Sequence, residues 1–279
     1  MKLASYNGFV NDMQSKGIEY AAERAARQGF EAVELLEFCT EKKFTLPRAN
    51  AAYARRVLRE NGLAIACYSV AAKLYEPNAE QTYDRMCRLI EWAAEAGSPY
   101  LHHTVTMGLS LTADSPDYRE MLETVLPTAE RIASKCAEYG MVCLYEPQGM
   151  YFNGTDGLSG LFDEVNRRTG NVRICGDLGN SLFVDTEPAE VVRRFASDIK
   201  HVHVKDYAVL DAPLEDERGY RSAGGRYLYD RDLGRGDIDL DECFRQLREA
   251  RYDGYVSLEL IKNDDDTVEG ATEFVRRRM

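Results

Sequence analysis

The sequence predicts an α/β protein folded as one closed (β/α)₈ barrel. Short β-rich runs alternate with longer amphipathic segments, and such alternation is typical of a parallel sheet with helices outside it. The alternation occurs eight times in 279 residues, a length that suits a barrel of roughly 250 residues. No G-x-G-x-x-G motif follows the first expected strand, which disfavours an open dinucleotide-binding sheet.

Each expected unit begins with a short strand. The strands cover residues 2–8, 30–38, 63–70, 98–105, 141–147, 171–180, 198–206 and 253–261. The helices that follow have apolar residues at spacings of three and four, and the first two close on Gly29 and Gly62, a common helix end. They cover residues 17–29, 48–62, 79–96, 117–139, 157–169, 187–197, 238–250 and 266–279.

No linker or low-complexity stretch divides the chain, so residues 1–279 are expected to form one domain. The longest expected irregular region covers about 207–237, between the seventh strand and the seventh helix. Irregular segments of that length are uncommon in compact domains and often act as lids over a site. We therefore regard this region as a candidate lid.

The composition of the chain limits which binding partners and which cellular compartment are expected. The net charge of −12 and the pI near 5.0 disfavour nucleic acid and anionic membranes as partners. The seven cysteines form no C-x-x-C pair, which favours buried, reduced thiols. The sequence shows neither a signal peptide nor an apolar run long enough to span a membrane. A cytoplasmic protein is expected.

Polar side chains lie at the ends of most expected strands. The active site of a (β/α)₈ barrel forms at the carboxyl ends of its strands, so these side chains are the candidates for chemistry. They are Glu34, His102, His103, Glu146, Asp177, His203, Lys205, Asp206 and Glu259.

Four of these residues make a coherent set on four successive strands: Glu146, Asp177, His203 and Glu259. Three buried carboxylates without a counter-charge would repel one another, and a divalent cation removes that repulsion. Oxygen-rich ligands with one nitrogen suit Mn²⁺, Mg²⁺ or Co²⁺, with Zn²⁺ as a further alternative. Taken singly, each has an ordinary explanation, such as a turn residue for Asp177. As a set they predict one metal ion.

The motifs LYEPQG, GDLGNS, HVHVKD, LGRGDID and YVSLEL resemble the sugar isomerase/epimerase branch of the xylose-isomerase-like TIM-barrel superfamily. That branch includes ketose 3-epimerases, hydroxypyruvate isomerase, 2-keto-myo-inositol isomerase and inosose dehydratase. The resemblance covers nearly the whole chain, but its motifs do not specify one activity. It implies that Glu146, Asp177, His203 and Glu259 bind a metal, with Mn²⁺ expected first, and that Glu146 and Glu259 form the acid/base pair. It also implies a homo-oligomer.

Three positions depart from the ketose 3-epimerases of that branch. The sequence has Phe152 where they carry a further glutamate, Asn180 where they carry a histidine, and Val209 where they carry an arginine. The metal and base residues are therefore present, whereas the residues that recognise a ketohexose are not.

The expected reaction is an isomerisation or epimerisation of a small sugar or cyclitol. The metal would polarise a carbonyl and stabilise an enediolate, while Glu146 and Glu259 remove and return a proton. The segment after the last strand is acidic, which favours a non-phosphorylated substrate. Lys205 is expected to donate to a substrate oxygen, or else to pair with Asp177 or Asp206. The further expected substrate contacts are His103, Asn180, Glu34 and Arg226.

Other functions remain open at this stage. With a leaving group on the neighbouring carbon, the same proton removal gives a lyase or dehydratase acting on a keto-sugar, inosose or 3-oxo-glycoside. A non-catalytic barrel subunit is a third interpretation, disfavoured by the intact Glu146 and Glu259. A trinuclear zinc nuclease of the same superfamily needs many histidines, and this chain has four.

Overall fold

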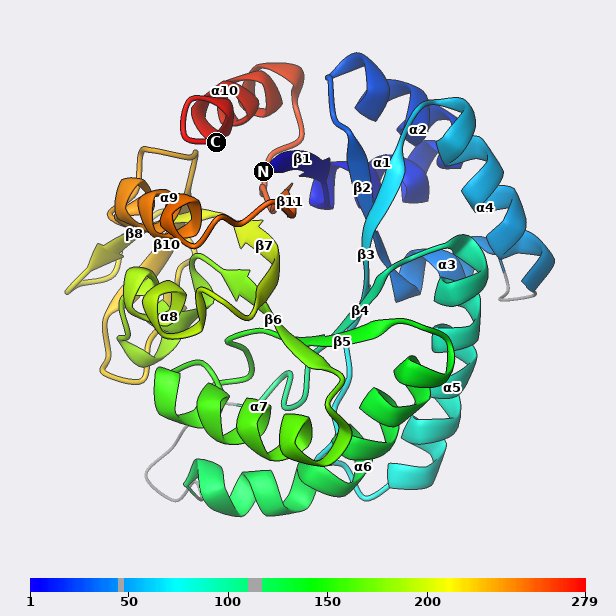
Figure 1. The fold of residues 1–279 in the computed structure, drawn as a ribbon. Coiled ribbons are helices and arrows are strands. Elements are labelled where there is room, and N and C mark those ends of the chain that lie inside the picture. The colour runs from blue at the N-terminus through cyan, green and yellow to red at the C-terminus, as the bar shows by residue number, and fades with distance from the viewer. Residues whose placement is uncertain (45–47, 110–116) are drawn as a thin grey trace.

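Eight parallel strands close into a barrel in the computed structural model, which describes residues 1–44, 48–109 and 117–279. Their order around the ring is β1-β11-β7-β6-β5-β4-β3-β2, and Figure 1 shows the helices surrounding them. The (β/α)₈ prediction is confirmed. The strands are β1 (Lys2–Ser5), β2 (Ala32–Leu36), β3 (Ala64–Val70), β4 (Tyr100–His103), β5 (Val142–Tyr145), β6 (Val172–Asp177), β7 (Ile199–Val204) and β11 (Tyr255–Leu258).

The helices cover the outside of the barrel, and the described part of the chain contains none that is long and apolar enough to cross a membrane. They are α1 (Asn7–Lys16), α2 (Ile18–Arg27), α3 (Glu37–Phe44), α4 (Arg48–Glu60), α5 (Ala79–Ala96), α6 (Tyr118–Glu138), α7 (Thr155–Thr169), α8 (Pro188–Phe195), α9 (Leu240–Glu249) and α10 (Asp265–Arg276), with a 3₁₀ turn η1 (Asn180–Val184).

The first expected strand was too long, because α1 already begins at Asn7. Phe9, Val10 and Met13 recur with helical spacing and are buried together in this helix, a pattern that identifies one face of a helix. The second expected strand ends early for a similar reason, since α3 begins at Glu37. Both extra helices start directly after a barrel strand, so they border the end of the barrel where the candidate site lies.

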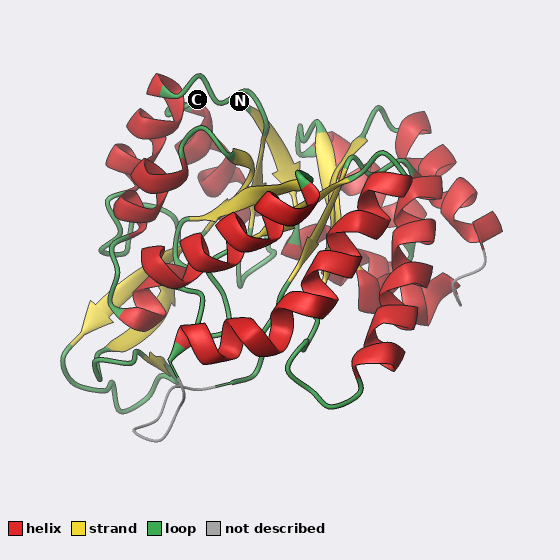
Figure 2. Ribbon diagram, turned by 60° about the horizontal axis from the view of Figure 1, so that its bottom comes forward, coloured by secondary structure: helices red, strands yellow, loops and turns green. Residues whose placement is uncertain are grey.

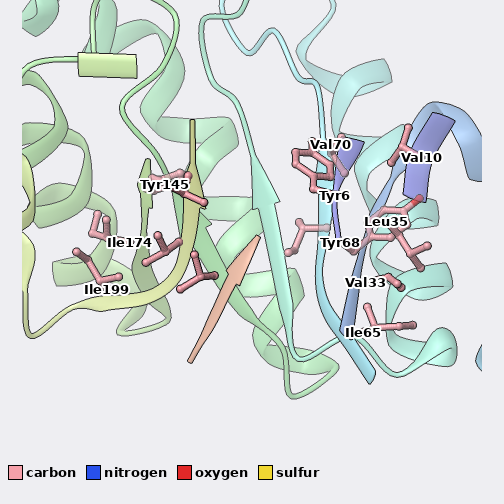
Figure 3. Close-up of a cluster of buried hydrophobic side chains, with 14 of the residues drawn as sticks. Tyr6, Val10, Val33, Leu35, Ile65, Tyr68, Val70, Tyr145, Ile174 and Ile199 are labelled. Carbon is pink, nitrogen blue, oxygen red and sulfur yellow. The ribbon is translucent and has the colours of Figure 1, made fainter. Parts of the chain in front are cut away.

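Side chains on the strands alternate between the layer beneath the helices and the interior of the barrel. Val33, Leu35 and Ile65 belong to the large core under the helices (Figure 3). The interior contains two separate apolar clusters: Ala4, Ala32 and Ala66, and Cys67, Leu144 and Cys175. Because these apolar clusters fill the lower interior of the barrel, the polar groups further along the strands form the floor of the site. No disulfide joins any of the seven cysteines, all of which lie in the described part of the chain, and six of them are buried.

The expectation that residues 207–237 are irregular is wrong in part, because three short strands interrupt the turns and loops of this segment. This segment contains a small antiparallel sheet with the order β8-β10-β9, formed by β8 (Asp206–Leu210), β9 (Tyr220–Arg221) and β10 (Tyr227–Arg231). Figure 2 shows this sheet at one end of the molecule, beyond the barrel strands. Leu228 and Tyr229 are buried, so the sheet packs onto the body of the protein.

Asp206 attaches the end of this segment to the barrel. Its Oδ2 accepts the backbone N–H groups of Gly234 and Gly236, both at 2.9 Å, and its Oδ1 accepts those of Tyr207 and Ile238 at 3.0 and 3.4 Å. The carboxylate is 2% exposed, so water cannot replace these bonds. The LGRGDID motif is therefore a backbone loop wrapped around one buried carboxylate.

We expect Asp206→Ala to lower the free energy of unfolding by about 1–3 kcal/mol, because buried N–H donors lose their acceptor. Urea denaturation followed by circular dichroism measures this change. Asp211→Ala is the matched control, because Asp211 is exposed and makes no hydrogen bond within the described residues. Equal stabilities of the two variants would contradict the anchoring role of Asp206.

Candidate active site

Four neighbouring strands of the barrel carry the four predicted metal ligands. Glu146 directly follows β5, Asp177 ends β6, His203 lies within β7, and Glu259 directly follows β11. These strands are adjacent in the ring, and Asp177 is in register with His203 across the β6–β7 pair. Ser257 is in register with His203 on the other side of β7, and Glu259 shares its face because it lies two positions further on. All four side chains therefore point into the mouth of the barrel.

The three carboxylates converge on one atom, Nδ1 of His203. The distances from it are 3.1 Å to Glu146 Oε2, 3.6 Å to Glu259 Oε2 and 3.7 Å to Asp177 Oδ2. Ligand atoms of Glu146, Asp177 and His203 all lie within 4.8 Å of one another. These three residues are buried, whereas the Glu259 side chain is 25% exposed. The structure thus brings together all four residues that the sequence singled out.

Glu34 supports His203 from below. Its carboxylate lies 2.7 Å from His201 Nε2 and 2.9 Å from His203 Nε2, and it also accepts a hydrogen bond from Ser69. Tyr6 stacks on the His203 ring at 5.2 Å. These contacts hold the ring with Nδ1 facing the carboxylates. Glu34 is fully buried beneath the imidazole, and His201 is hydrogen-bonded to it there.

Electrostatics in this cluster favour positive charge at the imidazole. Burial would lower the pKa of His203, but Cys175, Glu34 and Glu146 raise it well above its usual range. Burial would raise the pKa of Glu34 and of Glu146, yet the neighbouring histidines hold both well below normal. Burial also raises the pKa of Glu259, although Lys205 opposes this shift. The site therefore stabilises a cation at its centre.

The donor set fits a divalent metal ion. Oδ1 of Asp177 accepts the backbone N–H groups of Gly179 and Asn180 at 2.9 and 2.6 Å. Its buried Oδ2 accepts no hydrogen bond within the described residues, and it lies 3.0 Å from Lys205 Nζ. Three carboxylates and one imidazole nitrogen are ligands typical of Mn²⁺, Mg²⁺ and Co²⁺. Lys205 also lies 2.8 Å from Glu259 Oε2, so one lysine neutralises only part of the negative charge.

A cavity of about 470 Å³ opens above this cluster, within the range of roughly 300–1,000 Å³ that is typical of ligand sites. Polar groups of Glu146, His203, Lys205 and Glu259 line its floor. Three aromatic rings in mutual edge contact form part of its wall: Phe183, Tyr207 and Tyr220. Asn180 also lines the cavity and accepts a hydrogen bond from Lys205 at 3.1 Å. The predicted pairing of Lys205 with Asp177 is confirmed, whereas Asp206 binds backbone groups instead.

Three of the expected substrate contacts lie outside this cavity, and one of them is Glu34, which is buried against His203. His103 is fully buried and places its ring edge-on against Tyr145 at 5.2 Å. Arg226, in the 207–237 segment, pairs with Asp185 at the end of η1, with 2.8 Å between Nε and Oδ1. Neither side chain lines the cavity above the cluster. His103 and Arg226 are therefore not brought together with the four central residues.

His102 lies at the site in place of His103. Its Nε2 is 3.3 Å from Glu146 Oε1, its Nδ1 is 3.0 Å from Ser69 Oγ, and the residue lines the cavity. The register explains the choice, because His102 pairs with Leu144, which shares a face with Glu146 two positions on. The sequence shows that only one histidine of the pair faces inward, but only the pairing of β4 with β5 identifies which one.

We expect the two adjacent histidines to respond differently to alanine. His102→Ala removes a contact of Glu146 inside the cavity, so turnover should fall. His103→Ala truncates a buried ring outside the cavity, so it should lower the free energy of unfolding by about 1–3 kcal/mol and leave substrate affinity intact. Steady-state kinetics and urea denaturation on both variants measure these effects. The opposite pattern would show that the inward histidine has been misidentified.

Comparison with known proteins agrees with this architecture. The profile of the family described as "Xylose isomerase-like TIM barrel" matches residues 22–278. Inosose dehydratase of Geobacillus kaustophilus is 27% identical over 140 residues, which cover 49% of this chain and 44% of that protein. The chain thus spans less than half the length of the curated relatives it matches. These relatives are enzymes.

Three solved structures share the fold at identities below 20%. A probable 3-DHS dehydratase from Bacillus anthracis superimposes with a TM-score of 0.78, 18% identity and full coverage of both chains. D-allulose 3-epimerase from Methylomonas sp. gives 0.74, with 19% identity and coverage of 100% of this chain and 98% of that chain.

The third is a xylose isomerase-like TIM barrel protein from Mycobacterium smegmatis in complex with magnesium. Its TM-score is 0.72 at 16% identity, with 99% of this chain and 96% of that chain covered. At such identities the likeness shows the fold alone, whereas the profile match spans most of the sequence. The chain belongs to the xylose isomerase-like TIM barrel family.

Proposed function

We propose that this protein is a divalent-metal-dependent enzyme that moves a proton next to the carbonyl of a sugar or cyclitol, as an isomerase or epimerase. The observation that carries the proposal is the convergence of Glu146 and Glu259 on His203 at the floor of a cavity. These carboxylates come from β5 and β11, which β6 and β7 separate in the ring, so they approach the centre from different sides. A bound substrate carbon between them would have one carboxylate on each side.

Each residue of the site has a separate role in the proposed reaction. Glu146, Asp177, His203 and Glu259 would hold the ion, with Mn²⁺ expected first and Mg²⁺, Co²⁺ or Zn²⁺ as alternatives. When bound, it would supply Lewis-acid stabilisation of negative charge on a substrate oxygen. One of Glu146 and Glu259 removes the proton and the other returns one. Lys205 donates a hydrogen bond to a substrate oxygen, and Asn180 orients the Lys205 ammonium group.

The positions that depart from the ketose 3-epimerases support a substrate other than the familiar ketohexoses. Phe152 is buried in the core, and Val209 lies on β8. Neither lines the cavity, whereas Asn180 does. An uncharged sugar or cyclitol remains the expected partner, and the homo-oligomeric state and the cytoplasmic location stay predictions.

Dehydration is the second candidate, and the curated relatives favour it. The Geobacillus protein is named inosose dehydratase, and the structure that gives the TM-score of 0.78 is a probable dehydratase. If the carbon beside the reacting centre carries a hydroxyl group, removal of the α proton by Glu146 or Glu259 leads to loss of water. Lys205 lies 2.8 Å from Glu259, where an ammonium group could protonate the departing hydroxyl.

One experiment tests the shared first step and separates the two outcomes. The protein is incubated in D₂O with Mn²⁺ and, separately, with ketoses, inososes and 3-oxo-glycosides, and the products are followed by NMR. Deuterium at the α carbon without loss of water supports epimerisation or isomerisation, whereas an unsaturated product supports dehydration. Full activity of metal-depleted protein would contradict metal dependence, and no exchange with any of these substrates would contradict the proposed chemistry.

A further inference from the structure

A second cavity, of about 500 Å³, adjoins the first at the outer side of Lys205 and Glu259. One wall comes from the 207–237 segment and the other from the turn between β11 and α10. Both cavities are lined by Lys205 and Glu259, whose charged atoms lie 2.8 Å apart. A molecule bound over the metal ligands can therefore extend past this ion pair into the second space.

Four cations and five anions line the second cavity, and most of them already have partners. Lys205 pairs with Glu259 at 2.8 Å. Arg231 pairs with Glu217 at 2.6 Å, while Asp206 is occupied by backbone N–H groups. The remaining charged residues form no ion pair within the described residues, and they are two cations and two anions: Arg218, Lys262, Asp230 and Asp232. A charged ligand group of either sign would be attracted by two of these side chains and repelled by the other two, so the walls favour neither sign. Hydroxyl groups can donate hydrogen bonds to the carboxylates and accept them from the cations, so an uncharged polyol can bind both kinds of side chain.

The same cavity offers one apolar surface. Leu260 and Ile261 line it next to Glu259, and Ile261 is 61% exposed. A pyranose or cyclitol ring has C–H faces as well as hydroxyl edges, so it can pack its faces on these side chains while its hydroxyls reach the charged walls. A purely apolar group would leave the charged walls without partners.

We propose that the second cavity binds a second, uncharged polyhydroxylated ring of the substrate, so that the natural substrate is a carbohydrate of two linked rings. The reacting ring lies over His203, and the linkage passes the Lys205–Glu259 pair. This inference rests on the proposed function and adds the substrate class to it. Each cavity alone lies within the roughly 300–1,000 Å³ of an ordinary ligand site, which supports one ring in each.

Binding affinity tests the proposal without relying on turnover. Isothermal titration calorimetry on the Mn²⁺-loaded and metal-free protein compares 3-oxo-sucrose with methyl 3-oxo-glucoside, which lacks the second ring. Phenyl 3-oxo-glucoside tests whether an apolar group can replace that ring. We expect 3-oxo-sucrose to bind at least about tenfold more tightly than both other compounds, which corresponds to ~1.4 kcal/mol.

Ile261→Trp fills the second cavity from an exposed position, so the fold should tolerate it. This variant should lower the affinity for 3-oxo-sucrose to that for the methyl glycoside, and leave the latter unchanged. Leu214→Trp is the matched control, because Leu214 is 39% exposed and lines neither cavity. Equal affinities for the three compounds, or equal losses for all of them in Ile261→Trp, would overturn the second subsite. Tight binding of 3-oxo-sucrose without proton exchange would retain the subsite and refute only the proposed chemistry.

Discussion

Replacing Glu259 with glutamine is expected to lower turnover by about two to four orders of magnitude, the usual contribution of a positioned acid or base. The amide has the shape of the carboxylate but cannot accept the substrate proton at neutral pH. It also removes one of the three charges that face His203 Nδ1. The fold should survive, because Glu259 follows the last residue of β11 and its side chain is 25% exposed.

The measurement has to separate loss of the base from loss of the metal. Turnover is therefore recorded by α-proton exchange at saturating Mn²⁺, and the bound metal is counted by elemental analysis on the same sample. Glu269→Gln is the matched control, because Glu269 is an exposed glutamate on α10. A Glu259→Gln protein that keeps its metal and exchanges protons at the wild-type rate would refute the role of Glu259.

Glu34→Ala is expected to lower the free energy of unfolding by about 3–5 kcal/mol, because it removes one partner from a buried ionic cluster. Glu34 is fully buried and holds both His201 and His203. Without it, the His203 ring loses the contact that fixes its Nε2 side, and Nδ1, which faces the three carboxylates, is no longer held in place. Mutation of a residue that hydrogen-bonds to a metal ligand usually lowers the metal affinity by about 10–100-fold.

Urea denaturation gives the stability of this variant, and calorimetric titration with Mn²⁺ gives its metal affinity. Glu34→Gln should fall between the wild type and alanine, because the amide keeps one acceptor for a histidine N–H. Glu123→Ala, on the exposed side of α6, controls for removing a glutamate. If Glu34→Ala were destabilised yet bound Mn²⁺ with wild-type affinity, Glu34 would serve the fold and not the site.

The hydrophobic periodicity of the sequence predicts most strands and helices of the barrel. The elements that it predicts wrongly have a common cause. The strand cores and most helices match the expected ranges, but α1 and α3 begin where strands were expected to continue. The sheet in 207–237 was missed because β8 and β10 pair with each other antiparallel, outside the repeating pattern of the barrel. Periodicity reports which face of an element is apolar, whereas the pairing partner of a short strand depends on residues distant in sequence.

The sequence by itself determined the eight-fold alternation and the four ligand candidates. The spacing of two also puts His201, His203 and Lys205 on one face of a strand, because this spacing is a local property of the sequence. Tertiary structure decided what local spacing cannot: that His102 faces the cavity instead of His103, that Glu34 lies beneath His203, and that Lys205 divides two cavities. Each of these depends on the register between neighbouring strands and on how the 207–237 segment packs beside the barrel, and both are set by contacts between residues far apart in the chain.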